Sequence, residues 1–295
     1  MLNRADKMLR YFCRNQNCAM DFFEEEIIIP DAHLTYKQAL THNKELLDGL
    51  QYAAFVQKGI LPQDRHLNRI FKESFVIYKP QNIIGGDLYW VCEKNDLKIF
   101  AVGDCTGHGI SGAMLSVLAV SFLNYLVLGK DFISLGKVLE ELDKKWIEAF
   151  DQGLNMGFNN DWLEIGICAF NEKTRELHFA SAFNKLSYIA NGKEHTIGGN
   201  RYPIGGWQLE KHRSFTDHSI ILPPDSMVYL HSDGFKDQFG SLTKKRFGSY
   251  RFFNLLKSVS HLSTEQQRKA IEEEFIFWRG EEIQTDDMCL MGVRL

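Results

Sequence analysis

The chain has 295 residues, of which 44% are hydrophobic and 24% are charged, and its formal net charge is −4 at pH 7. This composition is ordinary for a soluble globular protein with one large domain or two small ones. The acidic balance, with no basic run longer than "KKR" at 244–246, excludes an extended basic face, so we expect no nucleic-acid partner.

The cysteines and the apolar runs indicate the cellular compartment of the chain. Six scattered cysteines without a C-x-x-C pair favour reduced thiols over a disulfide framework or a zinc site. The first residues lack the apolar core of a signal peptide. The longest apolar run, 113–128, contains three polar residues and is shorter than the roughly 20 residues of a membrane-spanning helix. We therefore expect a cytoplasmic chain with no membrane span.

The N-terminal part divides into two segments. Residues 1–33 show no pattern that predicts a structure, whereas residues 34–62 have the periodicity of a helix that ends at Pro62. The apolar positions recur every seven residues and are Leu40, Leu47, Ala54 and Leu61. This pattern fits either an amphipathic helix lying on the following domain or a regulatory linker that pairs with a second copy to form a homodimer.

Residues 63–295 are expected to form one domain that is rich in strands. Strands in "FVIYKP" and "DLYWVCEK" flank Gly85-Gly86, and "LKIFAVGD" follows a hairpin turn at Asn95-Asp96. Two helices are predicted over 111–128 and 134–150.

The rest of the domain continues with short strands. They are "WLEIGICAFN", "ELHFASAF", "KLSYIANG", "HRSFTDHSIIL" and "MVYLHSDGF". The segment at 179–189 is interpreted as a hairpin with Ala182 and Asn184 at its turn, and a helical stretch over about 248–278 precedes a last strand. Successive hairpins with paired helices predict an α+β fold in which helix layers cover antiparallel sheets.

The glycine-rich segment "VGDCTGHGISGAML", 102–115, contains a G-x-G-x-x-G pattern at 107–112. This pattern follows a strand and opens a helix, as a dinucleotide-binding loop does, and Asp131 lies near the expected distance. However, Asp131 falls between two predicted helices instead of ending a second strand. We therefore keep a dinucleotide oxidoreductase only as a minor alternative. Binding of the cofactor would raise the thermal stability of such an enzyme, and we expect no such stabilisation here.

Aspartates recur at the ends of predicted strands, each beside a glycine or another turn residue. They are Asp87, Asp104, Asp233, Asp286 and Asp287. A single aspartate in this setting is usually a turn former or a helix N-cap. If the strand ends converge, however, the carboxylates repel one another unless a cation compensates them. Clustered carboxylates are ligands that Mg²⁺ and Mn²⁺ prefer.

The ordered set of motifs resembles the metal-dependent protein phosphatases (the PPM superfamily), and in detail the bacterial SpoIIE-like branch of RsbU type. The motifs are "GGD" at 85–87, "GDCTGHGISGAM" at 103–114, "HSDGF" at 231–235 and "TDDMCL" at 285–290. The resemblance covers roughly residues 50–295. It implies an α-β-β-α sandwich of two central, mainly antiparallel sheets with helices outside.

The resemblance also implies a metal site with two divalent cations, Mn²⁺ or Mg²⁺. Asp104 would bridge the two ions with help from the Cys105 carbonyl, and Asp87 would hold one ion directly or through water. Asp233 and Asp286 would complete the site.

Other residues receive supporting roles by the same resemblance. Asp287 is expected to orient its loop, and Gly103 and Gly107 to allow tight backbone turns. His108 is a candidate for protonating the leaving group, although a packing or turn role is the more ordinary interpretation. Eukaryotic members bind phosphate through an arginine near the first acidic motif, whereas here Lys79 is the nearest base.

The implied activity is hydrolysis of phosphoserine or phosphothreonine on a protein by a metal-activated water. The resemblance indicates a bacterial signal-transduction pathway with partner switching, in which the substrate is a STAS-domain anti-sigma factor antagonist. The alternative is a catalytically silent scaffold that binds a phosphoprotein. The presence of all four acidic positions disfavours that alternative.

Overall fold

The structure, a computed structural model, describes residues 36–129, 134–150, 160–207, 210 and 212–295. The chain divides into two units, 1–46 and 47–295. The described part of the first unit is the beginning of helix α2 (Tyr36–Ile60). The expectations for residues 1–33 and for Asp131 lie outside the described residues.

Two antiparallel sheets form the centre of the second unit. The first sheet has the order β1 (Ser74–Lys79), β11 (Met288–Arg294), β10 (Met227–His231), β6 (Lys185–Ala190) and β7 (Lys193–Gly198). The second sheet has the order β2 (Asp87–Lys94), β3 (Leu97–Cys105), β4 (Trp162–Asn171), β5 (Glu176–Ala182) and β9 (His218–Ile221), and the short β8 (Ile204–Gly205) pairs with β4.

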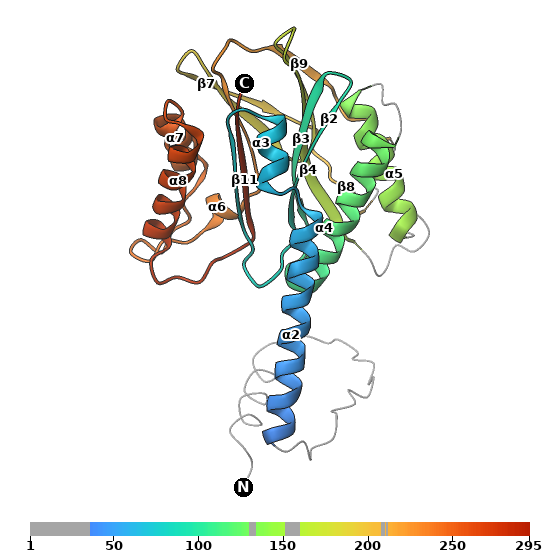
Figure 1. The fold of residues 1–295 in the computed structure, drawn as a ribbon, viewed down its shortest axis with the longest axis vertical. Helices are drawn as coiled ribbons and strands as arrows, with labels where there is room; N and C mark the ends of the chain where they lie inside the picture. The colour runs from blue at the N-terminus through green and yellow to red at the C-terminus, as the bar shows by residue number, and fades with distance from the viewer. Residues whose placement is uncertain (1–35, 130–133, 151–159, 208–209, 211) are drawn as a thin grey trace, which may run out of the picture. The chain divides into compact units, whose positions relative to one another are not determined.

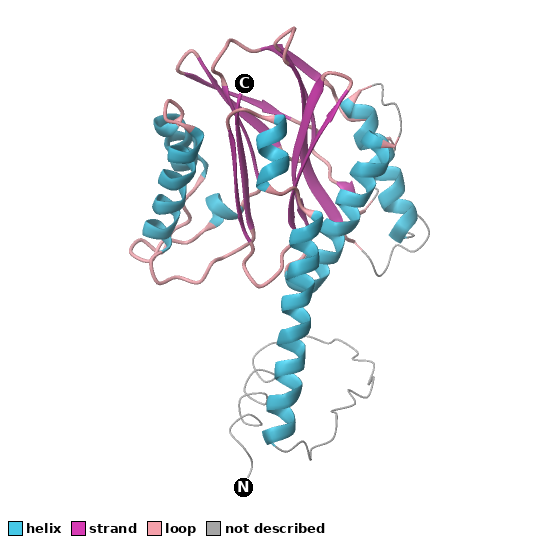
Figure 2. Cartoon of the chain, viewed as in Figure 1, coloured by secondary structure: helices cyan, strands magenta, loops and turns pink. Residues whose placement is uncertain are grey.

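Helices cover the outer face of each sheet (Figure 1). Helix α4 (Gly109–Leu123), its π-helical continuation η1 (Asn124–Leu128) and helix α5 (Leu135–Phe150) lie on the second sheet. Helices α7 (Ser249–Val259) and α8 (Thr264–Arg279) lie on the first sheet. The short α3 (Asp64–Ile70) contacts the edge strands β1 and β2, and α6 (Gly234–Asp237) follows the end of β10. Figure 2 shows the strands between the two groups of helices. The predicted α+β class and the α-β-β-α sandwich are confirmed.

The strand sequences explain why both sheets are covered on both faces. In β3, Ile99 and Ala101 pack under α4 and α5, whereas the alternating Phe100 and Val102 pack against the first sheet. Tyr229 of β10 faces α7 and α8 in the same way. Because side chains alternate between faces, such a strand is apolar at nearly every position and needs a layer on each side.

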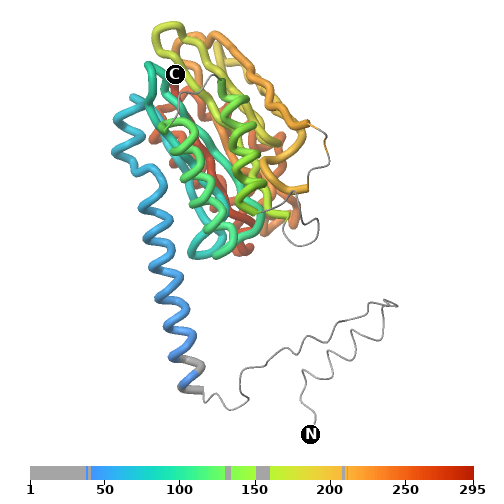
Figure 3. Tube along the Cα trace, turned by 90° about the vertical axis from the view of Figure 1, so that its right-hand side faces the viewer, coloured from blue at the N-terminus to red at the C-terminus, as the bar shows by residue number. Residues whose placement is uncertain are grey.

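The apolar run that begins α4 is a layer of this sandwich. Residues 109–128 are long and apolar enough to cross a membrane, but half of that stretch is buried within the protein. Leu115, Ala119 and Leu123 pack in the core beneath the second sheet, and α4 and α5 lie side by side in Figure 3. The prediction of a buried helix here therefore agrees with the packing.

Two expectations about local structure need correction, and one short helix is an addition to them. The segment at 179–189 is not a hairpin, because β5 belongs to the second sheet and β6 to the first, so the chain crosses between sheets at Phe183 and Asn184. The helical stretch over 248–278 is two helices, separated where Ser263 caps α8 through a capping box with Gln266. Helix α3 follows Pro62 and was not predicted.

Candidate metal and phosphoryl-transfer site

Three acidic residues form a row across the second sheet. Asp87 of β2 is the direct cross-strand partner of Asp104 of β3, and Asp104 is the direct partner of Glu164 of β4. Direct partners in antiparallel strands point to the same face. Their neighbours Leu88 and Leu163 pack under α4 and α5. The three carboxylates therefore face the first sheet, at one end of the sandwich.

The first sheet brings two further acids to the same end. Asp233 follows β10, and Asp286 precedes β11, which is the neighbour of β10 in the sheet. The end of β10 lies beside the start of β11 because His231 pairs with Leu290. The four aspartates predicted as metal ligands thus come from different strand ends and lie at the same end of the two sheets.

Ser232 connects the two sheets at this point. Its hydroxyl donates to Asp87 Oδ2 at 2.6 Å and accepts from the Cys289 amide at 2.9 Å. The second oxygen of Asp87 and one oxygen of Asp233, Oδ1 in each case, are buried and have no hydrogen-bond partner among the described residues. Buried carboxylate oxygens without donors are unfavourable unless another group compensates them.

Burial and mutual repulsion disfavour the ionised form of these acids. Burial raises the pKa of Asp87 well above its usual range, and the charge of Asp104 raises it further, whereas the Ser232 hydroxyl lowers it. Burial also raises the pKa of Asp104, with contributions from Asp233 and Asp286. The pKa values of Asp233, Asp286 and Glu164 are raised, chiefly by burial. A divalent cation reverses this effect, because it favours the ionised carboxylates.

These residues fit a divalent cation by their chemistry, although their side chains are not closed around one. In the part of the chain that the structure describes, no three His, Cys, Asp or Glu side chains already have the arrangement of a ligand set. The carboxylates are nevertheless near enough for Asp104 to raise the pKa of Asp87 and for Asp233 and Asp286 to raise the pKa of Asp104, in addition to the larger effect of burial. The strand register places Asp87, Asp104 and Glu164 side by side, and uncompensated carboxylates in such a position repel one another.

Asp287 has a different environment from Asp286. Its Oδ1 accepts from the Gln81 amide and its Oδ2 accepts from the Gly86 amide, both at 2.6 Å. A Cβ at Gly85 would lie 2.5 Å from this carboxylate. Both Asp287 oxygens therefore hold the backbone that leads to Asp87, as expected for a residue that orients a loop.

The glycines of the two loops allow their backbones to touch. A Cβ at Gly86 would lie 2.8 Å from the carbonyl oxygens of Cys105 and Gly107, and a Cβ at Gly112 would collide with the Gly107 carbonyl. Gly107 and Gly109 have φ of 81° and 66°, in the left-handed region that favours glycine. The glycine pattern therefore serves contact between the loops beside Asp104. The chain continues from β3 through α4 and α5 to an antiparallel β4, unlike a dinucleotide-binding unit.

The remaining sequence candidates occupy positions near these acids. His108 is exposed at the start of α4. Burial raises the pKa of Asp286, and the charge of His108 lowers this pKa to a smaller extent. Cys105 is buried with its carbonyl against Gly86. Lys79 forms an ion pair with Glu272 of α8 at 3.2 Å, so its charge is already engaged.

Sequence reasoning missed Glu164, Lys185 and Lys236. Glu164 lies inside "WLEIG" without an adjacent turn residue, so only the strand register reveals its position beside Asp104. Both lysines line a cavity of about 140 Å³ next to Asp104, Glu164 and Asp233. The "SDGFK" segment places Lys236 one turn after Asp233, and this spacing was the available signal.

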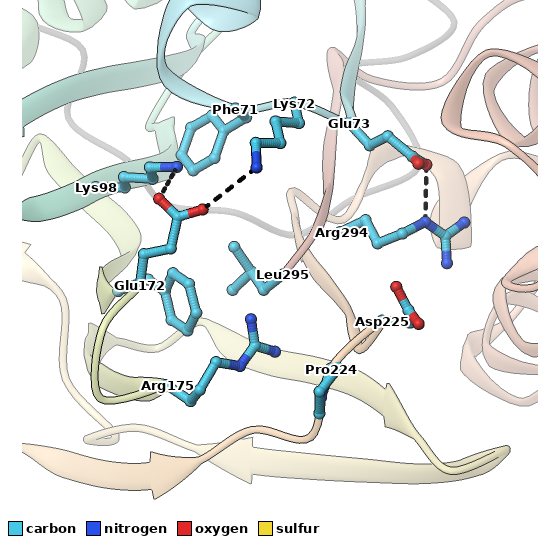
Figure 4. A pocket seen from close by; sticks show the side chains of 11 residues that line it. Phe71, Lys72, Glu73, Lys98, Glu172, Arg175, Pro224, Asp225, Arg294 and Leu295 are labelled. Carbon is cyan, nitrogen blue, oxygen red and sulfur yellow. Dashed lines mark hydrogen bonds and ion pairs between the residues drawn. The ribbon is translucent and has the colours of Figure 1, made fainter.

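A second charged cavity, of about 230 Å³, lies at the opposite ends of β3 and β4 (Figure 4). Its basic residues are already paired. Lys98 contacts Glu172 at 2.8 Å and Arg294 contacts Glu73 at 2.8 Å, while Arg175 donates to the Pro223 carbonyl at 2.7 Å. We assign no site there.

The fold and the row of acids define a PP2C-type phosphatase domain, and comparisons with known proteins agree. The family model described as "Stage II sporulation protein E (SpoIIE)" matches residues 95–295, so the chain belongs to the SpoIIE family. The chain is similar to the SiaA-PP2C domain of Pseudomonas aeruginosa, with 29% identity, a TM-score of 0.76 and coverage of 86% of this chain and 98% of that one.

More distant structures share the fold alone. The phosphatase domain of SpoIIE from Bacillus subtilis, solved with a fragment of its regulatory domain, is 16% identical with a TM-score of 0.57, and the match covers 76% of this chain and 63% of that one. RsbX in complex with magnesium is 14% identical with a TM-score of 0.52, and coverage is 75% and 94%. No curated protein sequence matches the chain.

Proposed function

We propose that this chain is a metal-dependent protein phosphatase that hydrolyses phosphoserine or phosphothreonine on a protein substrate. The observation that carries the proposal is the convergence of Asp87, Asp104, Asp233 and Asp286, with buried oxygens of Asp87 and Asp233 that lack a partner among the described residues. Two Mn²⁺ or Mg²⁺ ions, when bound, would supply an activated water and offset charge on the phosphoryl oxygens.

The chain's own residues have separate tasks in this proposal. Asp104, central in the row, would hold the ions together with the Cys105 carbonyl, and Asp87 would be aimed by its hydrogen bond from Ser232. Asp233 and Asp286 would close the site from the first sheet, while Asp287 keeps the "GGD" turn in place. His108, exposed near Asp286, is the candidate for protonating the departing serine oxygen, although a turn role at the start of α4 is the more ordinary interpretation.

Hydrolysis of p-nitrophenyl phosphate with Mn²⁺ tests this proposal. Wild-type chain is expected to be active, and Asp104→Asn and Asp233→Asn are expected to lose both activity and Mn²⁺ binding. A chain that binds Mn²⁺ but never hydrolyses the ester would support the silent scaffold instead. Activity that is insensitive to both substitutions would reject the metal assignment.

Helix α2 supports a regulatory role for the segment 34–62. Gln57 is buried, and its amide donates to the Gly85 carbonyl at 2.6 Å and to the Ser116 hydroxyl at 2.9 Å. It therefore joins α2 to the loop before Asp87 and to α4. We propose that docking of this helix orders the metal site. Equal turnover and equal Mn²⁺ affinity with and without residues 1–60 would reject this role.

The substrate and the assembly are further parts of the proposal. A phosphorylated STAS-domain anti-sigma factor antagonist, in the cytoplasm of a bacterium, is the proposed substrate, and faster release of phosphate from it than from an unrelated phosphoprotein would support this. Leu47, Tyr52 and Phe55 are exposed along α2. Such apolar exposure supports a homodimer through this helix, which sedimentation velocity would detect.

A further inference from the structure

The cavity beside the acidic site is lined by both acidic and basic side chains. It is lined by the carboxylates of Asp104, Glu164 and Asp233, and by the side chains of Lys185 and Lys236. The two lysines come from different segments, since Lys185 opens β6 after the crossing between the sheets and Lys236 lies in α6. A cavity with both kinds of charge suits an anionic ligand. Such a ligand would contact metal ions held by the carboxylates on one side and the ammonium groups on the other.

Lys236 is largely buried without a direct ionic partner. Its ammonium group makes no hydrogen bond or ion pair with any side chain in the described ranges. Burial lowers its pKa, although the charges of Asp233 and Asp237 act in the opposite direction. An ammonium that has lost water without gaining a close acceptor is unfavourable, so it is suited to bind an anion that enters the cavity.

The two ammonium groups act on the same region. The charge of Lys185 lowers the pKa of Lys236. His231 is buried and lines the same cavity. Two repelling cations directed at one cavity indicate a shared anionic ligand.

A simple counter-ion role for Lys236 is less consistent with the geometry. A lysine that served to neutralise Asp233 or Glu164 would lie in contact with one of them, as Lys79 does with Glu272 at 3.2 Å. Within the described residues, no such contact within 4.0 Å joins Lys236 to either acid. Lys79, the base nearest to Asp87 in the sequence, is engaged by Glu272 and is not free to bind phosphate.

We propose that Lys236, with Lys185 at the mouth of the cavity, binds the phosphoryl oxygens of the substrate next to the acidic site. This inference rests on the proposed function. Lys236 would contact the phosphoryl group directly, and the more exposed Lys185 would contribute less.

The test measures binding of inorganic phosphate to the full chain with Mn²⁺, by calorimetry, together with KM and kcat for p-nitrophenyl phosphate. Lys236→Met is expected to weaken phosphate binding and raise KM by about tenfold or more, and Lys236→Arg to stay within about threefold of wild type. Lys185→Met is expected to have a smaller effect. Lys193→Met removes the same charge at the exposed far end of the β6–β7 hairpin and should change nothing.

Affinity for Mn²⁺ and the unfolding temperature are measured for every variant. The inference requires that Lys236→Met weakens phosphate binding without weakening Mn²⁺ binding. If the Lys236→Met variant unfolds, the same measurements are made on Lys236→Gln. Unchanged phosphate binding in these variants would overturn the inference, and so would absence of phosphate binding by wild type. If wild type binds phosphate through Lys236 but does not hydrolyse the ester, the proposed function fails while the inference stands.

Discussion

Asp87 and Asp104 are direct cross-strand partners, and their carboxylates lie on the face of the second sheet that is turned toward the first. Burial raises the pKa of both carboxyls, the charge of Asp104 raises that of Asp87 further, and the charges of Asp233 and Asp286 raise that of Asp104. Two neighbouring carboxylates in a poorly solvated position are unfavourable without a compensating cation. The arrangement therefore reduces the stability of the metal-free protein and creates a reason to bind divalent metal.

Replacement of the central acid of the row is expected to abolish metal-dependent activity. Asp104→Asn keeps the shape of the side chain but removes its charge, so Mn²⁺-dependent hydrolysis of p-nitrophenyl phosphate should fall by about two orders of magnitude or more. Asp96→Asn is the matched control, because it makes the same change in the exposed turn at the other end of the β2–β3 hairpin. Equal losses in both variants would contradict a specific role of Asp104.

The raised pKa of Asp87 predicts how the stability of metal-free protein depends on pH. Burial and Asp104 raise this pKa in the folded state, whereas the unfolded chain ionises the group near the ordinary value of about 4. Between these two pKa values the folded state holds more protons than the unfolded state. The stability that the protonated Asp87 contributes to the folded state is therefore lost as the pH rises from about 4 through the raised pKa.

Asp87→Asn cannot ionise, and it is therefore expected to gain stability relative to wild type as the pH is raised from about 4.5 to about 8. Thermal unfolding in the presence of a chelator measures this difference. Saturating Mn²⁺ should remove the advantage of the variant, because the cation favours the ionised carboxylate. Parallel stability curves for the two proteins without metal would show that Asp87 is not held in this environment.

The link between α2 and the acidic site predicts an effect of Gln57. Gln57→Ala leaves the Gly85 carbonyl without its donor, and a buried unpaired group of this kind costs about 1–3 kcal/mol. We expect weaker Mn²⁺ binding and about three- to tenfold lower activity at limiting Mn²⁺. Gln51→Ala, on the exposed side of the same helix, serves as the control. A Gln57 variant with wild-type Mn²⁺ affinity would separate the helix from the site.

The contact between the two glycine loops predicts opposite effects for one substitution at two helical positions. Gly112→Ala puts a methyl group against the Gly107 carbonyl and 2.9 Å from Gly86 Cα, so it is expected to destabilise the protein by about 1–3 kcal/mol. Gly49→Ala in α2 has no atom within 4 Å of the added carbon and should stabilise by up to about 1 kcal/mol. Chemical denaturation measures both, and a neutral Gly112→Ala would contradict the loop contact.

Much of the architecture was predictable because the patterns were local. The turn at Asn95-Asp96 follows from two residues that tolerate positive φ, and both have it. The helix break before α8 also had a local signal, the Ser263 and Gln266 capping box, which was overlooked. The crossing at Phe183 and Asn184 had none, because the choice of sheet for β6 depends on pairing with β10, far along the chain.

The site shows the same division. The aspartates beside glycines stood out in the sequence, whereas Glu164 has the appearance of an outward-facing strand residue. Its position beside Asp104 follows from the register of β3 and β4, which no short segment encodes. Lys185 and Lys236 likewise come together only because β6 and α6 lie around one cavity.

A crystal structure of the chain soaked with Mn²⁺ tests the central claim most directly. Anomalous difference density should show two peaks among the carboxylates of Asp87, Asp104, Asp233 and Asp286, and the peaks should disappear in Asp104→Asn. Carboxylates that remain apart in the Mn²⁺-soaked crystal, with no anomalous peak between them, would contradict the account.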